Sequence, residues 1–171
     1  QVHLTTTDPA AHLTTTLDTE VDNLTVDAID PDQATQAYRD KIMATKGKNL
    51  DSAGRAALHE DLMSPCTEEI AVFQQFSRAV NKARDQFVIM DTAPTGHTIR
   101  LLQLPGSWTS YLDNGKGDAS CLGPMSGLEK NRATYRAAVE ALTDPTSTRL
   151  VLVARAQQST LREVARTLDE L

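Results

Sequence analysis

The stretch Phe87-Val-Ile-Met-Asp91-Thr-Ala-Pro-Thr-Gly-His97-Thr-Ile-Arg-Leu-Leu-Gln-Leu104 decides the fold. Its first four residues are apolar and predict a strand that is buried on both faces of a parallel sheet. An aspartate stands where this strand ends, and a turn of small residues then leads into an amphipathic helix. Ligands of open α/β sheets bind at the carboxyl ends of the strands. A carboxylate next to a helix N-terminus suits a magnesium-bound phosphate, so the stretch predicts one half of a phosphate site.

Length and composition limit the class of protein. A chain of 171 residues is expected to form one α/β domain with a single core. The formal net charge of −6 disfavours a nucleic-acid surface, which would be basic. No apolar run approaches the roughly 20 residues of a membrane span. Two cysteines do not make a disulfide framework and favour a reducing, cytoplasmic setting.

The two ends of the chain predict a piece of a longer protein. The chain begins with Gln1 and enters a strand-like pattern at once, and it ends at Leu171 within a helical pattern. We therefore expect an α/β fold, a doubly wound and mostly parallel sheet with flanking helices, that is truncated at both ends.

Periodicity and turn residues place the other elements. Asp30 followed by Pro31 is typical of a helix N-terminus. Gly-, Ser- and Asp-rich residues 106–127 form a long loop of a kind that is more often functional than merely connecting. Strands are expected at about residues 2–6, 24–29 and 149–154, the last of them buried, and helices at about residues 31–44, 51–63, 65–84, 97–104, 128–142 and 160–171.

Two aspartates at strand ends are the candidate catalytic residues. Asp8 follows the first strand and Asp91 ends the strand at 87–91. If these strands are neighbours, the two carboxylates flank one crevice. One acid on Mg²⁺ and another orienting a water is the usual division of labour in phosphoryl transfer. Taken singly, each aspartate is also explained as a turn or capping residue.

Cysteine and histidine give a second set of candidates. Cys66 follows a proline at a helix start, where the helix dipole stabilises a thiolate, and Cys121 lies in the long loop. Two cysteines on separate segments could share one soft ion, although each is equally explained as a small buried hydrophobe. His97 at a helix N-terminus is also explained as a solvated capping residue, and His3 shows no convincing partner in the sequence.

The phosphate-binding loop expected beside such a site is missing from the sequence. None of the eight glycines forms GxxxxGK[ST] or GxGxxG. Gly47-Lys48 lacks both the upstream glycine and the following hydroxyl residue. We therefore expect this chain by itself not to hydrolyse a nucleotide.

Four segments together resemble one family, the arsenite-translocating ATPases that drive arsenic-resistance pumps. Thr6-Thr-Asp-Pro-Ala10 resembles the first switch of that family, and Asp91-Thr-Ala-Pro-Thr-Gly-His-Thr98 resembles its second switch. Ser64-Pro-Cys-Thr-Glu-Glu-Ile-Ala71 and Ala119-Ser-Cys-Leu-Gly-Pro124 resemble its metalloid-site segments. The resemblance spans nearly the whole chain and implies a P-loop NTPase-like fold.

The resemblance also implies the role of each matching residue. Asp8 orients the attacking water, and Asp91 acts on Mg²⁺ in the ATP site. Thr95 and Gly96 sense the γ-phosphate. The metalloid ligands for As(III) or Sb(III) are Cys66, His97 and Cys121, with Ser64 as a weaker contact.

The same resemblance implies partners and a division of the chain. The partners are an integral-membrane arsenite pump subunit, a metallochaperone, and a second similar half in a pseudo-dimer or homodimer. The protein is expected in the cytoplasm, and at the inner face of the cell membrane when bound to the pump. The expected regions within 1–171 are the first switch (1–30), a helical insertion with Cys66 (31–86), the second switch (87–104), a metalloid loop (105–127) and a helix–strand–helix unit (128–171).

Two other functions fit parts of the pattern. A related ATPase that targets tail-anchored membrane proteins shares the fold and both switches, but it would carry a Met- and Leu-rich groove. Residues 64–76 and 106–127 show no such enrichment. A regulatory domain that binds a nucleotide without hydrolysing it is the second alternative, and a phosphate loop upstream in the gene would exclude it.

Overall fold

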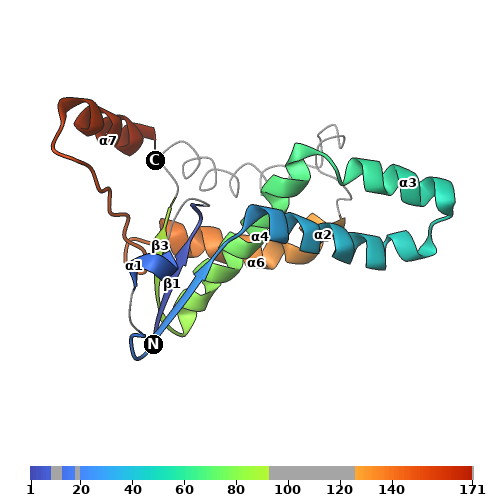
Figure 1. The fold of residues 1–171 in the computed structure, drawn as a ribbon, viewed down its shortest axis with the longest axis horizontal. Coiled ribbons are helices and arrows are strands. Elements are labelled where there is room, and N and C mark those ends of the chain that lie inside the picture. Colours follow the sequence, from blue (N-terminus) through green and yellow to red (C-terminus); the bar gives the residue numbers. More distant parts are fainter. Residues whose placement is uncertain (9–12, 18–19, 93–125, 171) are drawn as a thin grey trace.

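The computed structural model describes residues 1–8, 13–17, 20–92 and 126–170. The described elements, in chain order, are β1 (Val2–Thr6), α1 (Leu13–Thr16), β2 (Leu24–Ala28), α2 (Pro31–Thr45), the 3₁₀ turn η1 (Gly47–Asn49), α3 (Ser52–Asp61), α4 (Pro65–Asn81), the 3₁₀ turn η2 (Lys82–Arg84), β3 (Phe87–Asp91), α6 (Ser126–Thr143) and α7 (Gln158–Glu170). Figure 1 shows these elements along the chain.

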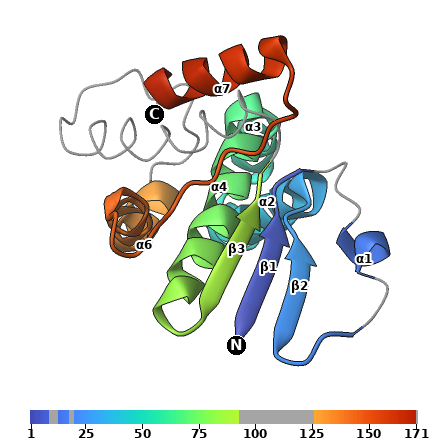
Figure 2. The same cartoon turned by 90° about the vertical axis from the view of Figure 1, so that its left-hand side faces the viewer.

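The three strands form a parallel sheet in the order β2-β1-β3. In the central strand, Thr6 lies opposite Ala28 of β2 and Asp91 of β3. Parallel strands need a crossover connection, and α2 to α4 supply it from β2 to β3, which lies on the other side of β1. The predicted α/β fold with a parallel sheet and flanking helices is confirmed (Figure 2).

The core lies between the sheet and helices α2, α4 and α6. Phe73 of α4 is fully buried at its centre, with ring centroids 5.1 Å from Tyr135 of α6 and 6.1 Å from Phe76. Aromatic rings at these separations pack favourably beyond the area that they bury. The inner face of α4 is buried at helical spacing, through Ile70, Phe73, Ser77 and Val80.

Local capping explains where α2 and α3 begin. The side chain of Asp30 accepts a hydrogen bond from the Gln33 N–H, and Pro31 occupies the first turn of α2. Asp51 likewise accepts from the Gly54 N–H at the start of α3. Such side chains satisfy N–H groups that have no partner within the helix. The predicted start of α2 is thereby confirmed.

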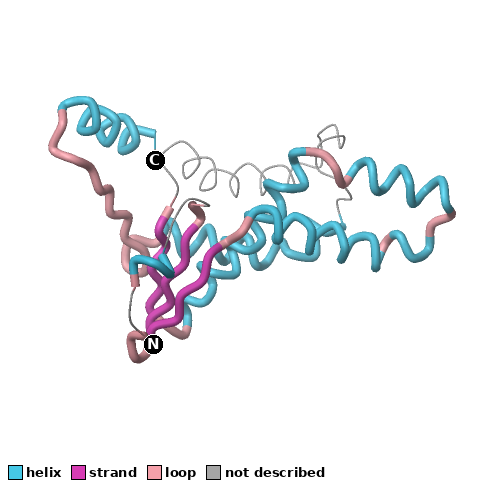
Figure 3. The backbone as a smooth tube through the Cα atoms, in the orientation of Figure 1, coloured by secondary structure: helices cyan, strands magenta, loops and turns pink. Residues whose placement is uncertain are grey.

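Helices α2 and α3 form a hairpin that projects away from the sheet (Figures 1 and 3). Arg39 Nε donates to the Leu62 carbonyl oxygen at 2.9 Å, and Arg55 Nη1 donates to the Gly47 carbonyl oxygen at 3.1 Å. The first bond joins α2 to the end of α3, and the second joins α3 to the turn η1 between the two helices. Among the described residues, no helix combines the length and the apolar character that crossing a membrane needs.

The expectation that the four apolar residues 87–90 are buried on both faces is wrong. Burial alternates along β3, and Phe87 and Ile89 are 68% and 45% exposed. Met90, on the opposite face, packs against the core. The described helices cover one face of this strand, so its other apolar face is open within the described part of the chain.

The buried strand predicted at residues 149–154 is also wrong. This segment joins α6 to α7 as an extended chain without strand pairing (Figure 2). Val151 and Val153 are 71% and 90% exposed. An apolar run becomes a strand only where a neighbouring strand accepts its hydrogen bonds, and none of the three described strands pairs with it.

Replacement of Thr5 by Val is expected to stabilise the fold. Thr5 is fully buried, and its hydroxyl has no hydrogen-bond partner in the described structure. Removing an unsatisfied buried hydroxyl while keeping the shape of the side chain should raise the free energy of unfolding by about 1 kcal/mol. Urea unfolding followed by circular dichroism measures this change. Thr5→Ala is the control, because it also removes a methyl group and should destabilise the fold; a Thr5→Val variant less stable than the wild type would contradict the assignment.

The stability of the core should fall at high pH. Burial raises the pKa of Tyr135 from 10.0 to about 12. The Tyr135 hydroxyl ionises at a lower pH in the unfolded chain than in the folded protein. The contribution of neutral Tyr135 to the free energy of unfolding is therefore fully present below pH 10 and is lost as pH rises to 12. The loss amounts to at most about 2–3 kcal/mol in the free energy of unfolding. Urea titrations at pH 9 and pH 12 should show a smaller loss in Tyr135→Phe than in the wild type, and equal losses would refute this role for Tyr135.

Candidate functional site

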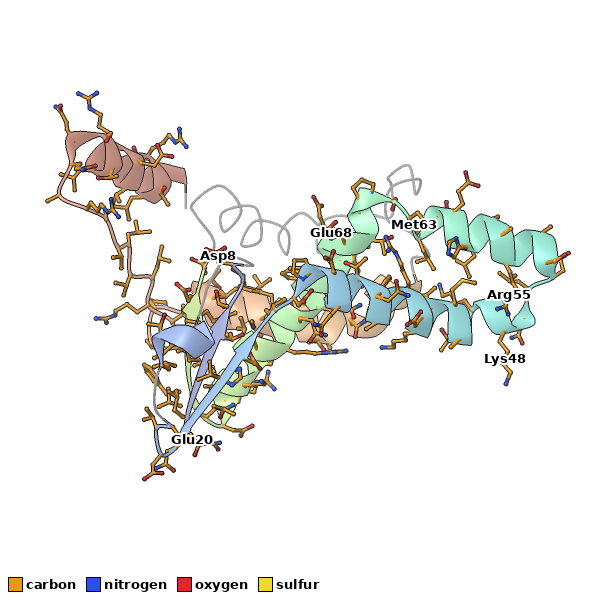
Figure 4. All side chains as sticks on the ribbon, in the orientation of Figure 1. Asp8, Glu20, Lys48, Arg55, Met63 and Glu68 are labelled. Carbon is orange, nitrogen blue, oxygen red and sulfur yellow. The ribbon has the colours of Figure 1, made fainter. Side chains whose placement is uncertain are left out.

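The candidate site lies at the carboxyl ends of β1 and β3. We call the residues Thr6 to Asp8, together with Asp91, the carboxyl edge. Thr6 and Asp91 are register partners in neighbouring parallel strands, and Asp8 lies two residues after Thr6 in the sequence. The condition under which the two carboxylates would flank one crevice, that the strands carrying them are neighbours, is therefore met. Figure 4 shows Asp8 at the end of the sheet opposite Glu20.

Two hydrogen bonds join the two strands at the carboxyl edge, and a third lies within the segment that ends β1. Thr6 Oγ1 donates to Asp91 Oδ2 at 3.2 Å and accepts from the Asp8 N–H at 3.1 Å. The Thr7 N–H donates to the Asp91 carbonyl oxygen at 2.9 Å. The chain that leaves β1 is thus tied to the last residue of β3 through both side chain and backbone.

The burial of these residues suits a site that is open to a ligand. Thr6 and Thr7 are buried, Asp8 is half-buried and Asp91 is exposed. A rigid, buried support therefore presents one carboxylate to solvent and holds a second close to the surface. This arrangement is what a site for an ion and an anionic ligand requires.

The donor atoms at the carboxyl edge fit a magnesium ion. Carboxylate and hydroxyl oxygens are hard ligands, and Mg²⁺ usually binds one or two carboxylates, several waters and the phosphates of a substrate. The described residues contain no group of three or more His, Cys, Asp or Glu side chains that could hold a metal ion. A single exposed carboxylate such as that of Asp91 is consistent with this hydrated mode of binding.

Ser64 and Cys66 lie at the start of α4. Ser64 is the N-cap residue and its Oγ lies 3.3 Å from Thr67 Oγ1, while Cys66 is half-buried in the first turn. Because α4 leads through η2 into the beginning of β3, it runs antiparallel to that strand. Its N-terminus therefore points toward the carboxyl edge (Figure 2).

The length of α4 carries Ser64 and Cys66 beyond the sheet. A helix of 17 residues spans about 25 Å, whereas a strand of five residues spans about 17 Å. In Figure 4, Glu68 in this part of α4 and Asp8 both lie away from Glu20, which marks the opposite end of the sheet. The structure thus places Cys66 on the same side of the fold as the two aspartates, on a separate element.

The remaining predicted site residues lie outside the described residues. They are Thr95, Gly96, His97 and Cys121. Their roles stay predictions.

Sequence reasoning missed a polar cluster on the helix side of the sheet. His3 is buried, and its Nε2 lies 3.0 Å from Lys82 Nζ and 3.4 Å from Asp27 Oδ2. Lys82 Nζ lies 3.4 Å from the same carboxylate oxygen. His3 therefore has partners that its sequence neighbourhood did not reveal, because they come from β2 and from the turn before β3. The sequence likewise does not reveal the bond from Thr6 to Asp91, because the two residues are far apart in the chain and only the strand register brings them together.

The chain is similar in sequence to known ATPases. The sequence profile of a family described as anion-transporting ATPase matches residues 1–171. The chain is 48% identical over 185 aligned positions to an arsenical pump-driving ATPase of Escherichia coli, and 48% identical over 186 positions to one of Acidiphilium multivorum. It is 30% identical over 181 positions to the ATPase GET3 of Candida glabrata.

The coverage of these matches is unequal. Each alignment with an arsenical pump-driving ATPase takes in 100% of this chain but 32% of the relative. The alignment with the GET3 protein takes in 90% of this chain and 51% of the relative. The chain thus spans about a third of the length of its arsenical pump-driving relatives.

Proposed function

The chain belongs to the anion-transporting ATPase family, and from this premise we propose that it is the switch-bearing part of an ATPase of arsenic resistance. The parent protein would couple ATP hydrolysis to the binding and extrusion of arsenite or antimonite. The observation that carries the proposal is the pairing of β1 with β3, which brings Asp8 and Asp91 to one edge of the sheet. The family resemblance inferred from the four sequence segments is confirmed by the comparisons.

The two aspartates divide the work of hydrolysis. Asp8 is half-buried and follows the end of β1, where its carboxylate orients the attacking water. Asp91 is exposed, and its carboxylate holds the cation beside the phosphates. A bound Mg²⁺ supplies charge stabilisation to the phosphates of ATP. We assign to Thr95 and Gly96, which follow β3 in the sequence, the role of sensing the γ-phosphate.

The metalloid is bound on the side of the fold that carries the two aspartates. Cys66 in the first turn of α4, together with Cys121 and His97, forms the ligand set for As(III) or Sb(III), and Ser64 lies beside it. Thiolate sulfur is the ligand that a soft ion prefers. The position of Cys66 beyond the carboxyl ends of the strands supports a metalloid site on the ATP side of the sheet.

One short segment couples the two sites. His97 stands six residues after Asp91, so a metalloid on His97 and a γ-phosphate at Asp91 to Gly96 act on the same short segment of the sequence. Each ligand favours the conformation of that segment to which it binds best. Metalloid binding and ATP hydrolysis are then linked through this arrangement.

The rest of the parent protein completes the site. A parallel sheet is normally covered on both faces, whereas Phe87 and Ile89 of β3 are exposed in the described structure. A strand, a phosphate loop and the helix that follows it would extend the sheet, with the helix over this open face and the loop as the cradle for ATP. A second similar half would form a pseudo-dimer or homodimer with this one.

The partners of the parent follow from its activity. A membrane-embedded arsenite pump subunit receives the metalloid, and a metallochaperone delivers it. The ATPase works in the cytoplasm, bound to the inner face of the cell membrane through the pump. Targeting of tail-anchored membrane proteins has less support, because identity to the GET3 protein is 30% against 48%, and residues 64–76 contain neither Met nor Leu.

Replacement of either switch aspartate should abolish most ATP hydrolysis by the parent protein. Asp8→Asn and Asp91→Asn keep the size of each side chain but remove its charge, so kcat should fall by about 100-fold or more. Asp85→Asn is the matched control, because Asp85 is exposed near the opposite end of β3. A steady-state phosphate-release assay measures the rates, and an Asp91→Asn protein with wild-type kcat would refute the proposal.

Loss of the thiols should uncouple the metalloid from hydrolysis. In the parent protein, the combined change Cys66→Ser and Cys121→Ser should reduce the ratio of ATPase rates with and without antimonite to about one, since hydroxyl oxygen binds a soft ion poorly. Glu68→Gln, an exposed change in the first turns of α4, should keep the wild-type ratio. Full stimulation in the doubly substituted protein would exclude these cysteines as the metalloid ligands.

A further inference from the structure

The Thr6 hydroxyl group connects the two aspartates of the site. Thr6 Oγ1 accepts from the Asp8 N–H at 3.1 Å and donates its own hydrogen to Asp91 Oδ2 at 3.2 Å. A hydroxyl has a single hydrogen to donate and lone pairs to accept with. The one donor of Thr6 is therefore directed to Asp91, and an acceptor site on the same oxygen holds the backbone at Asp8.

The surroundings of Thr6 fix this hydroxyl in place. The residue is only 1% exposed, and its carbonyl oxygen accepts from the Ile29 N–H at 2.9 Å. It is the last residue of the central strand and has register partners on both sides. A β-branched side chain is also stiff about χ1, so a buried threonine holds its hydroxyl in one direction.

We propose that Thr6 is a positioning residue of the ATPase, which orients Asp91 toward the magnesium ion and sets the turn that carries Asp8. This inference rests on the proposed function. Because Oδ2 of Asp91 accepts from Thr6, we assign the other carboxylate oxygen, Oδ1, to the magnesium side. The same hydroxyl fixes the backbone N–H of Asp8, so the two acids keep their relative placement while the ligand changes.

Thr5 provides a matched comparison on the same strand. It is as buried as Thr6, but it lies on the opposite face of the sheet, and its hydroxyl has no partner in the described structure. Removal of the Thr5 hydroxyl changes the same chemical group one residue away and leaves the carboxyl edge intact. An effect specific to the bridge must therefore appear at Thr6 and not at Thr5.

The test compares Thr6→Val, Thr6→Ser and Thr5→Val in the full-length parent protein. The first readout is hydrogen exchange of the Asp8 amide in metal-free protein. Thr6→Val removes the acceptor of this N–H and should speed exchange by about tenfold, as expected for the loss of one hydrogen bond. Thr6→Ser restores the acceptor and should return the exchange rate to within about twofold of the wild type, and Thr5→Val should show no change.

The second readout is the Mg²⁺ concentration that gives half-maximal ATP hydrolysis. Thr6→Val should raise it about fivefold or more, and Thr6→Ser should restore it, because a hydrogen bond to a charged group contributes roughly this much. A purely structural defect would lower the active fraction and therefore kcat, without moving the Mg²⁺ midpoint. This midpoint separates a positioning role from a role in folding.

The outcomes separate the two claims. Faster Asp8 exchange together with a raised Mg²⁺ midpoint in Thr6→Val alone supports the positioning role. Unchanged Asp8 exchange, an unchanged midpoint, or equal effects in Thr5→Val would each overturn it. A parent protein without Mg²⁺-dependent ATP hydrolysis would overturn the proposed function, whereas the exchange measurement on metal-free protein would still decide whether Thr6 holds Asp8.

Discussion

The parallel pairing of β1 with β3 is the constraint on which the rest of the structure depends. Strands of a parallel sheet point the same way, so the segments that follow them leave from the same edge. The register places Thr6 opposite Asp91, 85 positions away in the sequence. A slip of one residue would turn the side chains of β3 to the other face and separate Asp91 from Thr6. The position of α4 depends on the same pairing, because α4 leads into β3 and therefore begins on the same side of the sheet as the two aspartates.

Features that local sequence encodes could be predicted. Asp30 and Pro31 mark the start of α2, and the apolar spacing around Phe73 marks the buried face of α4. Asp8 and Asp91 were found because an acid that follows an apolar strand is itself a local pattern. The contacts of Thr6 and His3 could not be found in this way. His3 and Lys82 are 79 positions apart, and only the strand register brings them together.

The two errors in the fold have one physical cause. The apolar residues of β3 and of segment 149–154 predict burial, but they do not say which part of a protein provides the cover. In the described structure Ile89 and Val153 are exposed, and residues 149–154 pair with no described strand. The chain spans about a third of its arsenical pump-driving relatives, so a larger polypeptide is a natural source of both the cover and the missing strand edge. An apolar sequence pattern indicates that a segment favours burial. Whether the segment is buried depends on which other elements the fold places beside it.

We propose that the carboxyl ends of β1 and β3 bind the phosphates of ATP. The most direct measurement is a crystal structure of the full-length parent protein with Mg²⁺, ADP and a fluoride mimic of the γ-phosphate. We expect Asp91 in the coordination shell of Mg²⁺, directly or through one water, and Asp8 within hydrogen-bond distance of the attacking water. A nucleotide bound away from these strand ends, with neither aspartate near its phosphates, would refute this proposal.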